Sequence, residues 1–316
     1  MKEPLVRVSN LKKYFKTPMG SLHAVDDVSV DIQRSSTLGV VGESGCGKST
    51  LGRTVLRLVE PTGGEVLFEG ENIFKLKGAK LREVRKEMQI IFQDPYASLN
   101  PRLTVSEQIA EPLIVNNVFS DRQSMRSKVM QLMEVVELSP RFTHVYPHEL
   151  DGGRRQRIGI ARALALDPKF IVCDEPVSAL DVSVQAQILN LMMDLQDEMG
   201  LAYMFVSHDL SVVRHISHEV AVMYLGQCVE RASAEELFSN PRHPYTRALL
   251  DAIPVPNLSG RGKTRMILEG EVGVPIAPPP GCRFAPRCPN AKADCTASDI
   301  AAQECSPGHF VKCINI

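Results

Sequence analysis

The chain has 316 residues, a formal net charge of −1 and 44% hydrophobic residues, a balance typical of globular proteins. With so little net charge, we expect no nucleic-acid partner. No apolar run approaches the length of a membrane span, and the N-terminal sequence Met-Lys-Glu-Pro-Leu-Val-Arg lacks the apolar core of a signal peptide. We therefore expect a cytosolic chain, or one docked on a membrane through other proteins.

The N-terminal part of the chain is predicted to form strands, because segments 5–8 and 25–32 partly alternate apolar with polar residues. Tyr14 lies between them, and local sequence leaves two interpretations open: a ring that stacks on a nucleotide base, or a half-buried strand aromatic. A buried strand is predicted at 37–41. A helix is predicted at 48–59, where the apolar residues share one face.

The turn between this strand and this helix carries a complete phosphate-binding motif. It reads Gly42-Glu43-Ser44-Gly45-Cys46-Gly47-Lys48-Ser49-Thr50 and fits G-x-x-x-x-G-K-[ST] at every fixed position. The glycines let backbone N–H groups approach an anion at the start of a helix. Lys48 is expected to reach the β- and γ-phosphates of a nucleotide, and Ser49 to hold Mg²⁺. The alternative, an ordinary glycine-rich turn, is disfavoured by the strand-to-helix context.

Strands and helices alternate in the rest of the chain, which predicts an α/β fold with a largely parallel sheet. The predicted strands are 63–70, 88–93, 170–176, 201–206 and a hairpin at 219–229, and the predicted helical segments are 104–137, 154–164 and 184–199. Asp151 is placed as an N-cap or first-turn acid of the helix at 154–164. The Pro-rich stretch 275–280 predicts a linker.

Polar side chains with catalytic chemistry follow the other apolar strands. Asp174 and Glu175 end the strand at 170–173, where ligands bind in open α/β sheets. Asp174 is expected in the Mg²⁺ shell, and Glu175 as the general base for the attacking water. Gln93 and His208 also follow apolar strands and could approach the γ-phosphate, although either alone would be an ordinary loop residue.

The cysteines are distributed unevenly. Cys46, Cys173 and Cys228 are scattered, whereas the last part of the chain holds Cys282, Cys288, Cys295, Cys305 and Cys313. This asymmetry predicts a separate small unit that is metal-bound or cross-linked. The spacing differs from the usual zinc and ferredoxin patterns, so metal ligands and free thiols both stay open, and a cytosolic setting disfavours disulfides.

The order and spacing of these motifs over residues 4–235 resemble the nucleotide-binding subunits of ABC transporters. The matching pieces are the phosphate loop 42–49, Gln93, Leu150-Asp151-Gly152-Gly153-Arg154, strand 170–175, Ser178-Ala179-Leu180-Asp181 and His208. The loop 92–101 (Phe-Gln-Asp-Pro-Tyr-Ala-Ser-Leu-Asn-Pro), the segment 240–250 (Asn-Pro-Arg-His-Pro-Tyr-Thr-Arg-Ala-Leu-Leu) and the cysteine tail look like the peptide/nickel importer branch. The resemblance thus covers nearly the whole chain.

The resemblance implies a P-loop NTPase fold of the ABC type. Residues 1–238 would form the nucleotide-binding domain, with a RecA-like core, an antiparallel β subdomain and a helical subdomain at about 100–162. Residues 239–316 would form a peptide-importer-type extension with the Cys-rich tail.

The resemblance also implies how such a chain works. Two ATPase subunits sandwich two ATP molecules, and each site pairs the phosphate loop of one subunit with the signature segment of the other. ATP binding closes the dimer and hydrolysis reopens it, and this motion is passed to two membrane permeases. An extracytoplasmic substrate-binding protein delivers the cargo to these permeases. We therefore expect a peripheral subunit on the cytoplasmic face of the cell membrane that energises import of peptides, or of related cargo such as nickel chelates.

Individual roles follow by position in the family pattern. Tyr14 would stack on adenine, and His208 would sense the γ-phosphate. Gln93 would join Ser49 and Asp174 around Mg²⁺, beside a groove for the permeases' coupling helices. The nucleotide contacts across the dimer would come from Asp151, Gly152, Gly153 and Asp181.

One position departs from the family pattern. The family signature is Leu-Ser-Gly-Gly-Gln, whereas this chain has Asp151 in place of the serine and Arg154 in place of the glutamine. An ionised aspartate only accepts hydrogen bonds and would repel the γ-phosphate, an effect that Arg154 could offset in part. We expect an asymmetric heterodimer in which this chain gives its partner a weakened site. The alternative is that Asp151 simply caps its helix and the complex tolerates it.

The resemblance adds that some importer subunits of this branch hold a [4Fe–4S] cluster in the tail, here at Cys282, Cys288, Cys295 and Cys313. Two alternatives to transport stay open. A soluble ABC ATPase of translation or DNA repair would usually carry two cassettes or an inserted coiled coil, and this chain has neither. A regulatory ATP-binding module that senses iron or redox state through its tail is disfavoured by the intact Glu175 and His208.

Overall fold

The computed structural model of the chain describes residues 3–252 and 273–315; residues 253–272, inside the predicted extension, lie outside the described residues. The chain divides into two compact units. The first comprises residues 1–33, 37–74 and 205–316, and the second comprises residues 34–36 and 75–204.

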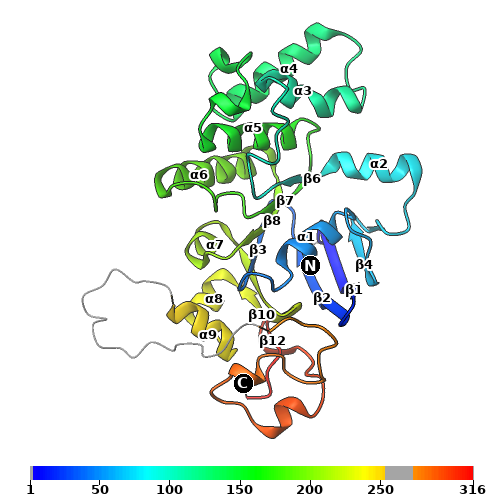
Figure 1. Cartoon of the computed structure of the whole chain (residues 1–316), viewed down its shortest axis with the longest axis vertical. Helices are drawn as coiled ribbons and strands as arrows, with labels where there is room; N and C mark the ends of the chain where they lie inside the picture. The colour runs from blue at the N-terminus through cyan, green and yellow to red at the C-terminus, as the bar shows by residue number, and fades with distance from the viewer. Residues whose placement is uncertain (1–2, 253–272, 316) are drawn as a thin grey trace, which may run out of the picture. The chain divides into compact units, whose positions relative to one another are not determined.

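The first unit contains an antiparallel sheet built from the N-terminal part of the chain (Figure 1). Its strands are β1 (Val6–Thr17), β2 (Gly20–Ile32), β4 (Gly63–Phe68) and β5 (Glu71–Asn72), in the order β2-β1-β4-β5. The predicted strands at 5–8, 25–32 and 63–70 are thus present, and both N-terminal strands are longer than expected. Their alternating apolar residues, such as Val6, Val8 and Val30, are buried.

A second set of strands in this unit carries the phosphate loop. Strand β3 (Thr37–Val41) is buried throughout and pairs in parallel with β9 (Glu219–Tyr224), which forms the predicted hairpin with β10 (Gln227–Ser233). Helix α1 (Lys48–Val55) follows β3 and is shorter than predicted, because Arg57 takes a left-handed conformation with φ of 50°. The other helices in the described part of the unit are α7 (Leu210–Ile216), α8 (Ala234–Ser239) and α9 (Pro244–Asp251).

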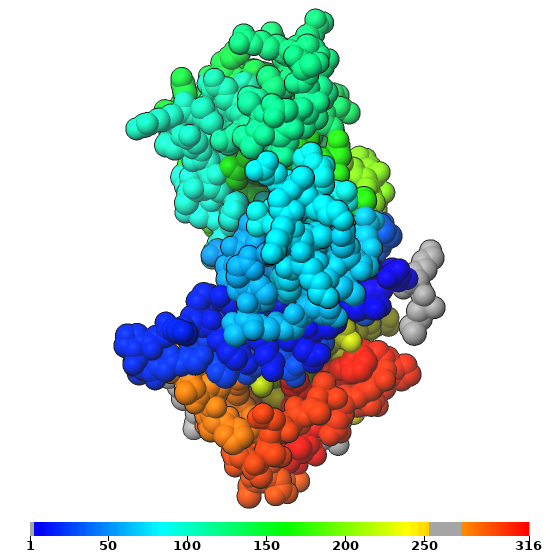
Figure 2. Space-filling model, turned by 90° about the vertical axis from the view of Figure 1, so that its right-hand side faces the viewer, coloured from blue at the N-terminus to red at the C-terminus, as the bar shows by residue number. Residues whose placement is uncertain are grey.

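The C-terminal tail packs on this unit instead of standing apart from it. Strands β11 (Gln303–Ser306) and β12 (His309–Val311) extend the order to β11-β12-β10-β9-β3, and short 3₁₀ turns lie at Ala285–Arg287 and Ala293–Thr296. The tail, orange to red in Figure 2, lies directly against the blue N-terminal strands.

The prediction of a linker at 275–280 needs correction, because its first residues pair with β2. Pro275 accepts a hydrogen bond from the backbone N–H of His23 at 2.9 Å, and the N–H of Ala277 donates to the Ser21 carbonyl at 2.8 Å. Ile276 thereby bridges Leu22 on the edge of β2. Proline has no N–H to donate, so this short pairing uses the carbonyl of Pro275 and the N–H of Ala277.

The second unit holds α-helices α2 to α6, more than half of the α-helices in the part of the chain that the structure describes. Its elements are α2 (Gly78–Glu87), β6 (Met88–Ile91), α3 (Val105–Val115), α4 (Arg122–Val135), α5 (Gly152–Leu164), β7 (Phe170–Asp174) and α6 (Val182–Met199), with short 3₁₀ turns at Pro140–Phe142 and Pro147–Glu149. Strand β8 (Ala202–Ser207) begins in this unit, and the strand order is β8-β7-β6 with β6 and β7 parallel. The helical segment predicted at 104–137 is interrupted, because Asn117 takes a positive φ of 50° and Asp121 caps a new helix.

Among the helices in residues 3–252 and 273–315, none is both long enough and apolar enough to cross a membrane.

Candidate functional site

The phosphate loop joins β3 to α1 in a shape that only glycine allows at two positions. Gly42 has φ of +152° and Gly47 has φ of +103°. A Cβ atom would lie 2.2 Å from the Met223 carbonyl oxygen at Gly42, and 1.9 Å from the Ala24 carbonyl oxygen at Gly47. Any larger residue would clash with the backbone of β9 at Gly42 and with the backbone of β2 at Gly47.

Lys48 is held inside this loop. Its side chain is buried, and Nζ donates to the carbonyl oxygens of Gly42 at 2.8 Å and Glu43 at 3.0 Å. Burial raises the pKa of the neighbouring Cys46 thiol, which packs as a neutral group. The loop therefore curls around an ammonium group at the start of a helix, an arrangement that suits a polyanion.

Tyr14 is fixed by residues that the sequence did not single out. Its ring stacks on His23 with centroids 3.9 Å apart and planes 12° apart. Its hydroxyl donates to Asp26, which also contacts His23 Nδ1 at 3.1 Å. Burial and the hydrogen bond to Asp26 raise the pKa of Tyr14. The side chain is thus a half-buried strand aromatic, as one of the two interpretations predicted, and its stacking on a nucleotide base stays a prediction.

In the second unit, the structure brings together two of the predicted catalytic residues. Asp174 is buried at the end of β7, and Glu175 follows with a left-handed φ of 47°. The Gln93 amide donates to Glu175 Oε2 at 2.9 Å. A non-glycine residue in this conformation is strained, and such strain concentrates at functional sites.

The other predicted residues end strands or cap helices. His208 is exposed in the first unit, directly after β8 and before Asp209, which caps α7. Asp181 caps α6 by accepting from the Val184 N–H at 3.0 Å and the Ser183 hydroxyl at 2.7 Å, and these bonds lower its pKa. Tyr14, the phosphate loop and His208 therefore belong to the first unit, whereas the second unit holds Gln93, Asp151, Gly152, Gly153, Asp174, Glu175 and Asp181.

Asp151 has the capping role expected of its position. It accepts from the Arg154 N–H at 2.8 Å as the N-cap of α5, and it also forms an ion pair with the Arg154 guanidinium. Gly153 fits closely behind it, because a Cβ there would lie 2.6 Å from Val184 Cγ1. This segment lines a surface hollow of about 350 Å³ that also contains Arg141 and Arg157.

The cysteine tail does not support the predicted cluster. Within residues 3–252 and 273–315, no three His, Cys, Asp or Glu side chains form a group that could hold a metal ion. All of the cysteines are free, so the cross-linked unit is not seen either. Burial raises the pKa values of the Cys282 and Cys288 thiols, and the Cys313 thiol adds to the rise in both. The tail is a packed, thiol-rich segment.

Sequence inspection missed two residues that contact the phosphate loop from far along the chain. Tyr245 accepts a hydrogen bond from the Glu43 N–H at 2.9 Å. Arg287 forms two hydrogen bonds to the Glu43 carboxylate, at 2.8 and 3.2 Å. The one signal in the sequence was Glu43 itself, because an acidic side chain in a phosphate-binding loop calls for a positively charged partner.

Comparisons with known protein families agree with this geometry. Residues 25–178 match the family described as ABC transporter, and residues 229–295 match the oligopeptide/dipeptide transporter C-terminal region. The oligopeptide transport ATP-binding protein AppF of Bacillus subtilis is 51% identical, over 98% of this chain and 97% of its own length. The dipeptide transport ATP-binding protein DppF of Haemophilus influenzae is 50% identical, over 99% and 97% of the two chains.

Solved structures support the fold. The dimeric ATP-binding cassette MJ0796, bound to ADP and Pi, matches with a TM-score of 0.66 and 29% identity over 72% of this chain and 98% of that one. The protein cbiO1 of Clostridium perfringens, at 24% identity and a TM-score of 0.67 over 76% and 92% of the chains, shows the same fold. The predicted ABC-type α/β fold is thus confirmed. The chain belongs to the ATP-binding subunits of oligopeptide and dipeptide ABC transporters, and it is an ABC transporter ATPase.

Proposed function

We propose that this chain binds ATP with residues 42–50 and Tyr14, and that hydrolysis of this ATP energises peptide import. The observation that carries the proposal is the complete phosphate loop, curled around Lys48 at the start of α1. On binding, the triphosphate would replace the loop carbonyls as the partner of the Lys48 ammonium. Tyr14, oriented by His23 and Asp26, would offer its other face to adenine.

The Mg²⁺ ion that accompanies ATP would be held by hard oxygen ligands. The proposed ligands are the Ser49 hydroxyl, the buried Asp174 carboxylate and the Gln93 amide oxygen, a donor set that suits this ion. When bound, Mg²⁺ would neutralise charge on the phosphates. Glu175 would accept the proton of the attacking water while Gln93 fixes its orientation, and His208 would contact the γ-phosphate.

We further propose that the chain works as a peripheral subunit on the cytoplasmic face of the cell membrane. Its partners would be a second ATPase, two permeases and an extracytoplasmic binding protein. The exposed rings of Phe92 and Tyr96, which flank Gln93, support a permease contact here, since Tyr96 is 58% exposed and braced by Arg155 at 3.8 Å from its ring centroid. In this proposal residues 1–238 are the cassette and 239–316 the importer-type extension.

Affinity purification of the tagged chain from native membranes, followed by mass spectrometry, tests the transport assignment. We expect two permeases and a second, different ATPase, and the accompanying binding protein would narrow the cargo. A chain recovered alone, or with ribosomal or DNA-repair proteins, would contradict import while leaving the ATPase chemistry intact.

The altered signature, with Asp151 and Arg154, supports the further proposal that the two ATPase subunits form an asymmetric heterodimer. Asp151 carries its negative charge where the family's serine would donate to the partner's γ-phosphate. The ion pair with Arg154 offsets part of that charge. The site completed by this chain's signature would therefore be the weaker of the two.

The Asp151→Ser variant is expected to raise the ATPase rate of the assembled pair by about tenfold, since a serine removes the repulsion and donates a hydrogen bond to a charged group. Serine also caps helices, so α5 should start normally. Steady-state ATPase rates of the reconstituted pair would measure the change. The matched control is Asp121→Ser, the same substitution at the N-cap of α4, where the bond to the Ser124 N–H is 2.7 Å. An unchanged rate in Asp151→Ser would favour simple helix capping.

A [4Fe–4S] cluster on Cys282, Cys288, Cys295 and Cys313 is a separate proposal that rests on the resemblance alone, because the described residues do not bring three such side chains together as metal ligands. After anaerobic purification, the full chain should be brown and contain about four iron and four sulfide per chain. A colourless, iron-free protein would contradict it.

A further inference from the structure

The tail contacts the proposed nucleotide site at two separate points. Arg283 precedes the 3₁₀ turn Ala285–Arg287 and Arg287 is its last residue; their side chains are only 7% and 8% exposed. Arg283 pairs with Asp26, and Arg287 pairs with Glu43. Both carboxylates belong to the first unit, more than 240 residues earlier in the chain. Two buried guanidinium groups from one short segment therefore each meet a carboxylate of the site.

At the phosphate end, every polar group of Glu43 is engaged. Its N–H donates to the Tyr245 hydroxyl, its carbonyl accepts from Lys48 Nζ at 3.0 Å, and its carboxylate is bound by Arg287. Tyr245 is itself fully buried and packs against Tyr224 and the tail residue Phe284, with centroids 4.6 and 5.4 Å away. The position of Glu43, and with it the resting place of Lys48, is thus determined by α9 and the tail.

The charge of Glu43 gives this contact a direct effect on phosphate binding. A carboxylate inside the phosphate loop repels an incoming polyanion, and in a partly buried site one unit charge shifts the binding energy appreciably. The Glu43 side chain is 24% exposed, so solvent screens it only in part. Arg287 neutralises this carboxylate at 2.8 Å. Without Arg287, the phosphate loop would carry an uncompensated negative charge.

At the adenine end, Arg283 acts through Asp26. The Asp26 carboxylate accepts from the Tyr14 hydroxyl and contacts His23, so it fixes both rings of the stacked pair. Arg283 also donates to the Leu225 carbonyl, in the turn between β9 and β10. The guanidinium therefore ties Asp26 to the hairpin that supports the phosphate loop.

We propose that Arg283 and Arg287 are positioning residues through which the C-terminal tail sets nucleotide affinity, Arg283 at the adenine end and Arg287 at the phosphate end. The inference rests on the proposed nucleotide site and adds the tail to it. It predicts different effects at the two ends. Loss of Arg287 should weaken nucleotide binding more as the number of phosphates rises, whereas loss of Arg283 should weaken the binding of every adenine nucleotide equally.

The test is a calorimetric titration of the full chain with ATP, ADP and AMP. For Arg287→Gln, we expect the Kd of ATP to rise about tenfold, that of ADP about threefold and that of AMP less than twofold, since the repulsion grows with ligand charge. For Arg283→Gln, we expect a rise of about threefold for all three nucleotides, because only the adenine contact is loosened. Lys292→Gln, which removes one exposed tail charge, is the control for net charge and should leave all three Kd values unchanged.

A rescue separates electrostatics from general loosening of the fold. Glu43→Gln combined with Arg287→Gln removes both charges and should restore ATP affinity to within about twofold of the wild type. The inference is overturned if either arginine variant binds all three nucleotides like the wild type. It is also overturned if Arg287→Gln weakens ATP and AMP by the same factor, or if the double variant is no better than Arg287→Gln. A wild-type chain that binds no ATP would overturn the proposed function along with it.

Discussion

Replacing Glu175 by Gln is expected to lower the ATPase rate of the assembled transporter roughly 100- to 10,000-fold, the range that a general base contributes. The substitution keeps the size of the side chain and removes the group that would take the proton from water. The Gln93 amide can still donate to the new side-chain oxygen, since that bond uses Oε2 of Glu175 at 2.9 Å. The neighbouring Asp174 stays in place, so ATP and Mg²⁺ should bind as before.

The measurement pairs a steady-state ATPase assay with a direct ATP-binding titration on the same preparation. The control is Glu198→Gln, which removes an exposed carboxylate near the end of α6 in the same unit. Loss of hydrolysis with intact ATP binding would assign the base role to Glu175. If both properties were lost together, Glu175 would instead be needed for the fold, and a residual rate near that of the wild type would move the base elsewhere.

The strand, loop and helix around Lys48 could be predicted from the sequence, because the whole motif is local. Nine consecutive residues fix the turn, and the apolar strand before it has no other way to be buried. Asp174 and Glu175 could be predicted for the same reason, as a short apolar strand directly precedes them. The exact length of α1 could not, since its end depends on the left-handed conformation of Arg57 and not on the apolar pattern, which continues through Leu58.

The contacts of the tail could not be predicted from any local pattern. Arg287 and Glu43 are 244 residues apart, and nothing near either residue specifies the other. Pairing of Ile276 with Leu22 was hidden for a different reason, because prolines on either side of a short segment normally indicate a linker. Long-range ion pairs and edge pairings of this kind are decided by tertiary packing, which the periodicity of a sequence does not record.

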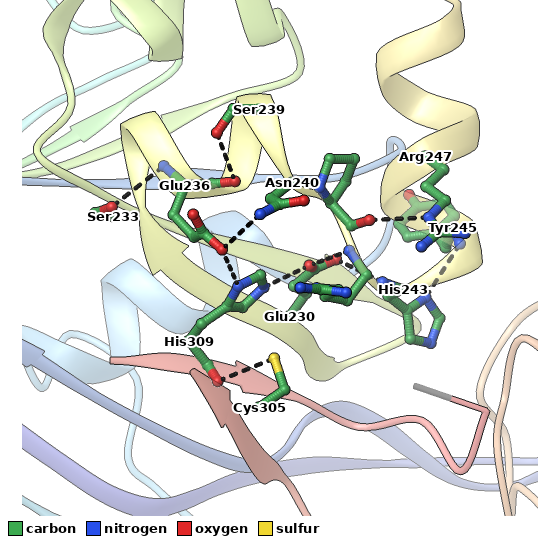
Figure 3. A network of polar contacts seen from close by, with 12 residues as sticks. Glu230, Ser233, Glu236, Ser239, Asn240, His243, Tyr245, Arg247, Cys305 and His309 are labelled. Atoms are coloured by element: carbon green, nitrogen blue, oxygen red, sulfur yellow. Dashed lines mark hydrogen bonds and ion pairs between the residues drawn. The ribbon is translucent and has the colours of Figure 1, made fainter. Parts of the chain in front are cut away.

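Attachment of the tail depends on a buried pair of polar residues, Glu230 on β10 and His309 on β12 (Figure 3). His309 and Glu230 are fully buried, and His309 Nε2 lies 2.8 Å from Glu230 Oε1. The other ring nitrogen of His309 lies 3.3 Å from Glu236. Glu230 also accepts from the backbone N–H groups of Arg242 and His243, at 2.7 and 2.9 Å. The carboxylate thus joins the tail to the segment that precedes α9.

Hydrogen bonds connect Glu230 to the phosphate loop through His243 and Tyr245. Burial lowers the pKa of His243 to about 4, so its ring is neutral near pH 7 and Nδ1 can accept from the Tyr245 N–H at 3.1 Å. Tyr245 in turn holds Glu43. The segment 240–250, which marks the importer branch in the sequence, therefore connects the site to the tail's anchor.

His309→Ala is accordingly expected to lower the free energy of unfolding of the first unit by about 3 kcal/mol, because it leaves the buried Glu230 carboxylate without its side-chain partner. Chemical denaturation of the full chain, followed by a probe in the first unit, would measure the loss. The control is His215→Ala, which removes an exposed histidine of α7 in the same unit and should cost less than about 0.5 kcal/mol. Equal losses in the two variants would show that Glu230 is satisfied by Arg242 and His243 alone, and that the tail is held by its other contacts.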